Sequence, residues 1–279
     1  MNRRPIFLIS CLAFGLAFFY IPILSMIVFS FNKSRLATVW GGFSTQWYVK
    51  LFDNKQVWDA AILSLEIAVI SASIATILGT MAGVALARFR SFRGRTLFSG
   101  LVTAPLIMPE VITGISSLML FIMMAEWIGW PAKRGFTTVT LAHITFSMVY
   151  VTTVVQSRLS SVDIAVEEAA ADLGSKPWQV MTDVTLPIIS PAIVSGWLLA
   201  FTISLDDVVI TNFTTGPGAT TLPILIWSKV KLGVTPDINA LATIIVAIVT
   251  VGVIAAGIIL TRAERRRELE VQMAIKANG

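Results

Sequence analysis

The amino-acid sequence predicts an all-α membrane protein that crosses the membrane with six helices. Three observations predict this fold class: the composition, six long apolar stretches, and the placement of the lysines and arginines. The 279-residue chain is 56% hydrophobic and 13% charged, which is about half the charged fraction of a typical soluble domain. Its mean hydropathy is +0.81. The single cysteine, Cys11, excludes an internal disulfide framework, and no cysteine–histidine cluster in the sequence predicts a metal site.

The six spans follow from length, because a membrane-spanning helix needs about 20 mostly apolar residues. The stretches that qualify are residues 6–30, 60–86, 97–124, 137–157, 188–212 and 238–261. Lipid offers no hydrogen bonds to the backbone, so each stretch is predicted to be a helix. The first is interpreted as a retained span, since its apolar core is too long for a signal peptide. Pro105 and Pro109 predict a kink in the third span near Glu110.

Positively charged residues predict the orientation, since lysine and arginine accumulate in cytoplasmic loops. With the N-terminus inside, most of them fall on the cytoplasmic side, including four arginines in residues 87–95 and the run Arg265–Arg267. Both termini are therefore expected in the cytoplasm. This distribution also accounts for the net charge of +5, so we expect no nucleic-acid partner.

The chain divides into three predicted parts. Residues 1–59 hold the first span and an outer loop, residues 60–262 hold a core of five helices, and residues 263–279 form a cytoplasmic tail. Within the core, the cytoplasmic loop 158–187 separates the fourth span from the fifth. A second long outer loop, residues 213–237, precedes the last span.

The cytoplasmic loop 158–187 is predicted to fold into two short amphipathic helices. Ser161 or Asp163 can cap the first helix, and consecutive alanines favour it. Gly174 suits the position just after its end, where a left-handed residue is common. Leu186-Pro187 is expected to end the second helix before the fifth span begins. These features fit a docking surface for another protein and fit a solvated connector equally well.

The same loop carries a motif that resembles the cytoplasmic signature of ABC importer permeases. That signature reads E-A-A-x-x-x-G, then nine residues, then I-x-L-P. The matching residues are Glu168, Ala169, Ala170, Gly174, Leu186 and Pro187, with Val184 in place of the isoleucine. The resemblance implies the type I ABC importer permease fold, with a coupling helix over residues 168–174 that docks on a separate ATPase.

Further stretches resemble the polyamine-importer permeases, and this resemblance covers nearly the whole chain. They are 29-FSFNKSR-35, 172-DLG-174, 196-GWLLAFTISLDDVVI-210 and 239-NALATI-244, while 103-TAPLIMPEVITG-114 and 214-TTGPGATTLP-223 are most similar to the second permease subunit of putrescine importers. The resemblance implies import of a polyamine, and putrescine in particular, across the bacterial inner membrane. The implied partners are a second homologous permease, two ATP-binding subunits, a soluble polyamine-binding protein on the outer side, and membrane lipid.

The chain itself is expected to be a non-catalytic subunit without a bound cofactor. Its sequence lacks the G-x-x-x-x-G-K-[ST] phosphate loop, so ATP would be hydrolysed by a partner subunit. The alternative function is a self-contained cation channel or secondary transporter. The lack of repeated halves and the presence of the coupling motif argue against that alternative.

Four carboxylates inside the predicted spans are the candidate substrate-pathway residues. In order of preference they are Asp206, Asp207, Glu110 and Glu66, the first two being ranked together. A charge at mid-membrane costs about 2.5–3.5 kcal/mol, so a role is expected for such residues. A rise of about 1.5 Å per residue puts Glu110 deepest and the other three in the outer half of the membrane. There they could replace the water that a polyamine cation loses on entry.

The aspartate pair also has other interpretations. Either residue could pair with Lys229 or Lys231, cap a broken helix, or face water at the outer boundary. Successive helical residues point about 100° apart, so the two aspartates are not expected to do the same job. One could face the pathway while the other pairs with the partner permease. His143, alone in the fourth span, is predicted to be a hydrogen-bonded packing residue.

Overall fold

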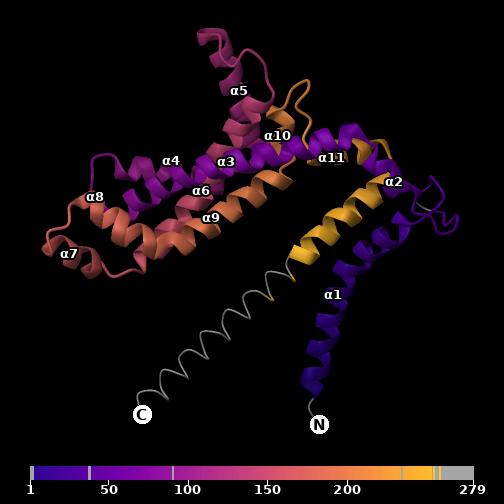
Figure 1. Cartoon of the computed structure of the whole chain (residues 1–279), viewed down its shortest axis with the longest axis horizontal. Coiled ribbons are helices and arrows are strands. Elements are labelled where there is room, and N and C mark those ends of the chain that lie inside the picture. The colour runs from indigo at the N-terminus through magenta and orange to yellow at the C-terminus, as the bar shows by residue number, and fades with distance from the viewer. Residues whose placement is uncertain are drawn as a thin grey trace. The chain divides into compact units, whose positions relative to one another are not determined.

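Helices make up the regular structure of the described part of the chain, apart from one isolated bridge between Asn32 and Phe43 (Figure 1). The computed structural model describes residues 3–36, 39–89, 91–233 and 235–252, together with residues 254 and 258. The prediction of an all-α fold is confirmed. The predicted tail, residues 263–279, lies outside the described residues.

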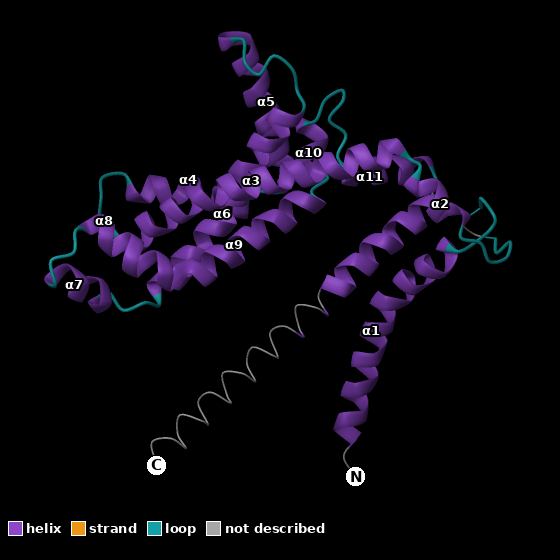
Figure 2. Ribbon diagram, in the orientation of Figure 1, coloured by secondary structure: helices purple, strands orange, loops and turns teal. Residues whose placement is uncertain are grey.

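The helices follow one another along the chain with loops between most of them (Figure 2). Their bounds are α1 Arg3–Ser30, α2 Gln46–Phe52, α3 Lys55–Arg88, α4 Arg95–Ile107, α5 Glu110–Ile128, α6 Phe136–Ser160, α7 Ala165–Asp172, α8 Pro177–Gln179, the π-helical η1 Val180–Thr185, α9 Leu186–Asp206, α10 Val209–Thr214 and α11 Leu222–Leu232. A further helix spans Pro236–Gly252.

The chain forms two compact units. The first unit is drawn from Met1–Lys55 and Lys229–Gly279, and the second unit is Gln56–Ser228. All the candidate pathway and coupling residues belong to the second unit. The candidate site therefore lies within that unit.

Five of the described helices are long and apolar enough to cross a membrane. They are Ile6–Ser30, Lys55–Arg88, Glu110–Ile128, Phe136–Ser160 and Pro177–Asp206. Arg95–Ile107 and Pro236–Gly252 are shorter apolar helices. The predicted last span continues to residue 261, so its second half falls largely outside the described residues.

The third predicted span is two helices rather than one kinked helix. α4 ends at Ile107 and α5 begins at Glu110, while Met108 and Pro109 between them are extended, with ψ of 138° and 137°. Pro109 has no N–H to continue α4, and a residue before proline favours extended backbone. The predicted position of the change is correct, but the helix stops and restarts there instead of bending.

The fifth predicted span, residues 188–212, is wrong as a single helix. α9 ends at Asp206, Asp207 is extended with φ −65° and ψ 127°, and α10 begins at Val209. The Asp207 carboxylate accepts hydrogen bonds from backbone N–H groups in the first turn of α10. These bonds satisfy donors that a restarted helix would otherwise leave without partners.

The expected helix end at Leu186-Pro187 is also wrong. The chain is helical from Pro177 to Asp206, and the π-helical segment η1 lies immediately before Leu186. A π turn holds more residues than an α turn. The ring of Pro187, which would clash with a regular preceding turn, is accommodated after this wider turn within a continuous helix.

The core of the second unit lies where α6 packs against α3 and α9. Of the most apolar 18-residue stretch of each helix, 67% is buried in α6, 39% in α3 and 28% in the helix that contains α9. Glycines allow the close approach, since a Cβ on Gly79 of α3 would lie 2.7 Å from the carbonyl oxygen of Met148. Val151 and Val155 of α6 fill the buried centre. This packing holds α3, α6 and α9 in place against one another.

Replacing Gly79 with alanine should destabilise the second unit by about 1–3 kcal/mol, because the backbone oxygen of Met148 cannot move aside. Gly100→Ala in α4 is the matched control, since no atom lies within 4 Å of the added Cβ there. Alanine at position 100 should leave the free energy of unfolding unchanged or raise it. Thermal unfolding of the detergent-solubilised protein measures both changes. Equal unfolding temperatures for the two variants would contradict the packing argument.

Candidate functional site

The break between α9 and α10 gives the two neighbouring aspartates different surroundings. Asp206, the last residue of α9, is exposed. Only 7% of the Asp207 side chain is exposed. The two carboxylates therefore meet different groups, although they are adjacent in the chain.

Asp207 lies in a buried polar cluster. Its Oδ2 accepts hydrogen bonds from both the N–H and the hydroxyl of Thr211, each at 2.7 Å, and lies 3.2 Å from His143 Nε2. Its Oδ1 accepts a hydrogen bond from the N–H of Ile210 at 3.2 Å. Both oxygens are thus bound by the protein itself. Among the interpretations of the pair, capping of a broken helix is the arrangement found for Asp207.

His143 connects this cluster to α3. The side chain is 3% exposed, and Nδ1 lies 2.7 Å from Ser204 Oγ, which lies 2.9 Å from Ser71 Oγ. With Nε2 donating to Asp207, Nδ1 accepts from Ser204. The prediction that His143 is a hydrogen-bonded packing residue is confirmed. The serines were not predicted, because hydroxyl residues recur throughout the apolar spans and no spacing marks these two.

Asp206, Glu110 and Glu66 are exposed on this chain. The ion pairs within the described residues are Arg88–Glu167, His143–Asp207 and Lys229–Asp237, and none involves these three acids. The structure does not bring Glu110 or Glu66 into hydrogen-bond contact with either aspartate within the part that it describes. A carboxylate exposed on a spanning helix is expected to meet water or a partner rather than lipid.

The ends of α7, the predicted coupling helix, are set by local signals. Ile164 directly precedes α7, and Asp163, one of the two predicted caps, stands one residue earlier and accepts a hydrogen bond at Oδ1 from the N–H of Ala165 at 3.0 Å. Gly174 follows the end of α7 with φ +91°, in the left-handed region. This agrees with its predicted position and explains why a glycine stands there.

The motif residues of this loop differ in exposure. Glu168 and Ala169 are exposed and Ala170 is half-buried. Leu186 is half-buried and packs against the core of α3, α6 and α9, while Pro187 is exposed.

Two large apolar side chains outside the motif are open to solvent beside α7. Leu173 is 88% exposed and Trp178 is 63% exposed. Sequence reasoning did not select them, because their exposure depends on how the loop folds. Glu168, Leu173 and Trp178 are thus three exposed side chains of loop 158–187, one charged and two apolar.

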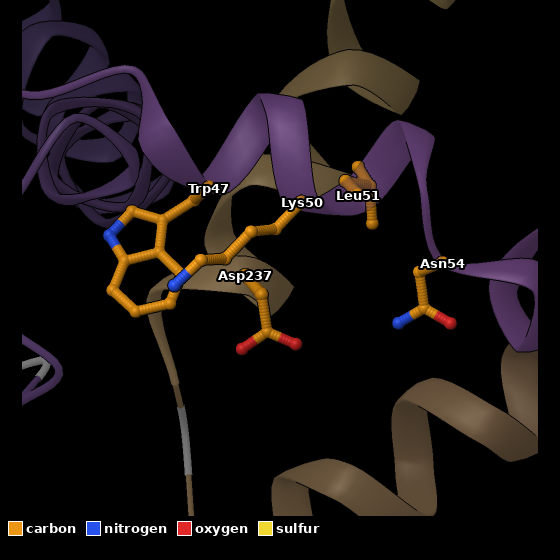
Figure 3. Close-up of a pocket in the computed structure, with 5 residues that line it drawn as sticks. All are labelled: Trp47, Lys50, Leu51, Asn54 and Asp237. Carbon is orange, nitrogen blue, oxygen red and sulfur yellow. The ribbon is translucent and has the colours of Figure 1, made fainter.

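The first unit contains a pocket of about 280 Å³ lined by Trp47, Lys50, Leu51, Asn54 and Asp237. Figure 3 shows the Lys50 ammonium beside the Trp47 indole, with Nζ 4.8 Å from the ring centroid. The Asp237 carboxylate is drawn in the same space.

Asp237 is itself paired with Lys229, with Nζ 3.1 Å from Oδ2. Burial alone would raise the pKa of the Asp237 carboxyl, but hydrogen bonds from Thr235 and Lys229, and the Lys229 charge, hold the pKa below its ordinary value. Lys50 and Lys229 together outnumber this single acid. The pocket lining therefore offers no surplus of negative charge to a multiply charged cation, and the Lys229 ammonium is paired with Asp237.

Residues 75–269 match the family described as binding-protein-dependent transport system inner membrane component. The chain is 50% identical over 278 residues to the putrescine transport system permease protein PotI of Escherichia coli (strain K12), covering 98% of this chain and 99% of that protein. It is 42% identical over 243 residues to the spermidine/putrescine transport system permease protein PotC of the same strain, covering 87% and 89%.

Among solved structures, the chain is similar to a chain of a bacterial ABC transporter involved in the import of the acidic polysaccharide alginate. The TM-score is 0.69 at 15% identity, covering 92% of this chain and 98% of that chain. At this identity the likeness shows the fold alone. The predicted importer-permease fold is confirmed.

Proposed function

Because the chain belongs to the family of binding-protein-dependent transport system inner membrane components, we propose that it is the transmembrane permease subunit of an ATP-driven polyamine importer. The observation that carries the substrate is the full-length similarity to a putrescine permease, at 50% identity. Identity to a spermidine/putrescine permease is lower, at 42%. This difference favours putrescine as the polyamine.

Exposed carboxylates on the spans suit such a substrate. A polyamine carries several positive charges at neutral pH, and its burial without compensating negative charge would be prohibitive. Asp206 is the first pathway candidate because it is exposed at the C-terminal end of α9, where helix carbonyls add negative potential. Glu110 and Glu66 follow, and all three must bind weakly enough to release the cation.

Asp207 has a supporting part in this proposal. Its capping of α10 ends α9 at Asp206 and so determines where the exposed carboxylate lies. In this proposal the Asp206 carboxylate contacts the cation, and Asp207 stabilises the break between α9 and α10.

Partner subunits would supply the energy for transport by hydrolysing ATP. Two ATP-binding subunits would hydrolyse ATP and dock on Glu168, Ala169, Ala170 and Gly174, with Leu186 packed against the core and Pro187 exposed after it, and this chain would hold no cofactor. A second homologous permease would complete the pathway, and a soluble polyamine-binding protein would deliver substrate from outside. The protein is a multi-pass inner-membrane protein, and we place both termini in the cytoplasm.

Reconstitution in proteoliposomes tests this function. The complete complex, with its binding protein and internal ATP, should accumulate labelled putrescine, and unlabelled putrescine should compete better than spermidine. The purified chain alone should show no uptake. ATP-independent uptake by the isolated chain would instead support the alternative, a self-contained channel or secondary transporter.

A further inference from the structure

Two adjacent glutamates in the first turn of α7 lie in opposite surroundings. Glu168 is exposed, whereas the side chain of Glu167 is 16% exposed. Glu167 precedes the E-A-A motif, and no sequence pattern singled it out. Its position suits a connection to the rest of the protein rather than contact with a partner.

One oxygen of Glu167 is the meeting point of three elements. Arg88, the last residue of α3, approaches Glu167 Oε1 with both Nε and Nη2 at 3.0 Å. Thr185, the last residue of η1, donates its hydroxyl to the same oxygen at 3.0 Å. Arg88 also donates to the carbonyl oxygen of Val162, on the segment that leads into α7, at 3.5 Å. A single carboxylate therefore ties α7 to α3 and to the start of α9.

The groups that hold Glu167 are themselves packed. Thr185 is 2% exposed. Ala87, next to Arg88, packs against the same buried core as Met181 and Leu186, which flank Thr185 in the chain. Charge-assisted hydrogen bonds are stronger than neutral ones, and loss of one partner leaves the other charge unpaired. Movement of α7 is therefore expected to carry Arg88 and Thr185 with it.

The segment that ends at Thr185 connects this contact to the pathway candidates. η1 is a π-helical turn, a feature that often marks functional positions in helices. α9 then continues for 21 residues to Asp206, a length of about 31 Å. A displacement of Thr185 would therefore be passed along this helix to the break at Asp206 and Asp207.

We propose that Glu167 is the positioning residue that transmits movement of the coupling helix α7 to α3 and α9. The inference rests on the proposed function, since it takes α7 as the helix that docks on an ATPase. It gives the two neighbours separate tasks. Glu168 meets the ATPase, and Glu167 connects α7 to the spans.

The ratio of polyamine imported to ATP hydrolysed by the reconstituted importer tests the proposal. Glu167→Gln keeps the size of the side chain but loses the charge, and should lower this ratio roughly three- to tenfold while ATP hydrolysis continues. Arg88→Gln should lower it similarly, and the double variant should be no worse than either single change, as expected for one shared contact. Asp183→Asn, an exposed acid in η1, is the matched control and should keep the wild-type ratio.

A cross-link keeps the proposal testable if Glu167→Gln fails to assemble. Cys11 is the single cysteine of the chain, so in a Cys11→Ser background the pair Glu167→Cys and Thr185→Cys can be joined by a short thiol-reactive reagent. The cross-linked protein should regain the wild-type ratio of polyamine imported to ATP hydrolysed. The same double-cysteine protein without the cross-link should show a lowered ratio. Loss of import on joining would overturn the proposal, because α7 would then have to slide along η1 during transport.

The two proposals fail in different ways. A wild-type complex that imports no polyamine would count against the proposed function. A wild-type complex that imports normally, with a ratio unchanged by Glu167→Gln, would leave that function in place and overturn the role of Glu167.

Discussion

Replacing Asp206 with asparagine should reduce putrescine uptake by about tenfold or more while the importer stays assembled. The Asp206 carboxylate is exposed at the end of α9 and takes part in none of the ion pairs found within the described residues. Removing its charge removes part of the stabilisation that offsets desolvation of the cation. Uptake of labelled putrescine by proteoliposomes, normalised to the amount of assembled complex, measures the loss. Asp206→Glu, which keeps the charge, should retain most of the uptake.

Asp207→Asn should act on folding instead. Asparagine has one acceptor oxygen where Asp207 has two, and those two meet Thr211, Ile210 and His143. A buried donor left without a partner costs about 1–3 kcal/mol. We expect a lower unfolding temperature and less assembled complex. If the two asparagine variants have the same effects on stability and on uptake, the division of roles between the aspartates is wrong.

Residues 201–214 show how far a site of this kind can be predicted from sequence. The apolar run indicates a spanning helix, and the two acids within it mark the position of interest. The break could not be predicted, because a continued helix and a capped restart compete at Asp207. The outcome depends on His143, which reaches Asp207 only after α6 and α9 have packed, and on Ser204, which contacts the other ring nitrogen of His143.

The coupling loop was more predictable because its signals are local. Asp163 and Gly174 set the ends of α7 through contacts within a few residues. Pro187 was misinterpreted because the preceding π turn is not visible in the residue types. Glu167 was missed for a related reason, since its partners Arg88 and Thr185 come from other elements.

The largest loss of ATPase binding is expected from changes on the exposed surface of the coupling loop. Leu173 and Trp178 are large apolar side chains left open on a polar loop, and such groups commonly mark interaction surfaces. A few anchors of this kind carry most of the binding energy of an interface. Leu173→Ala combined with Trp178→Ala should therefore reduce the co-purified ATP-binding subunits roughly tenfold or more. Glu168→Lys, which reverses an exposed charge on the same loop, should have a similar effect.

Controls for these changes come from the predicted outer side of the same chain. Leu232 and Trp127 are 91% and 77% exposed, so their replacement by alanine removes equally open side chains from two segments that we expect on the side of the membrane opposite the ATPase. The ATP-binding subunits should still co-purify with those variants, and the partner permease should co-purify with all variants. Normal ATPase binding by Glu168→Lys and by the double alanine variant would move the docking surface elsewhere on loop 158–187. Loss of binding in Glu168→Lys, with binding retained in Glu167→Gln, would establish that neighbouring glutamates divide docking from transmission.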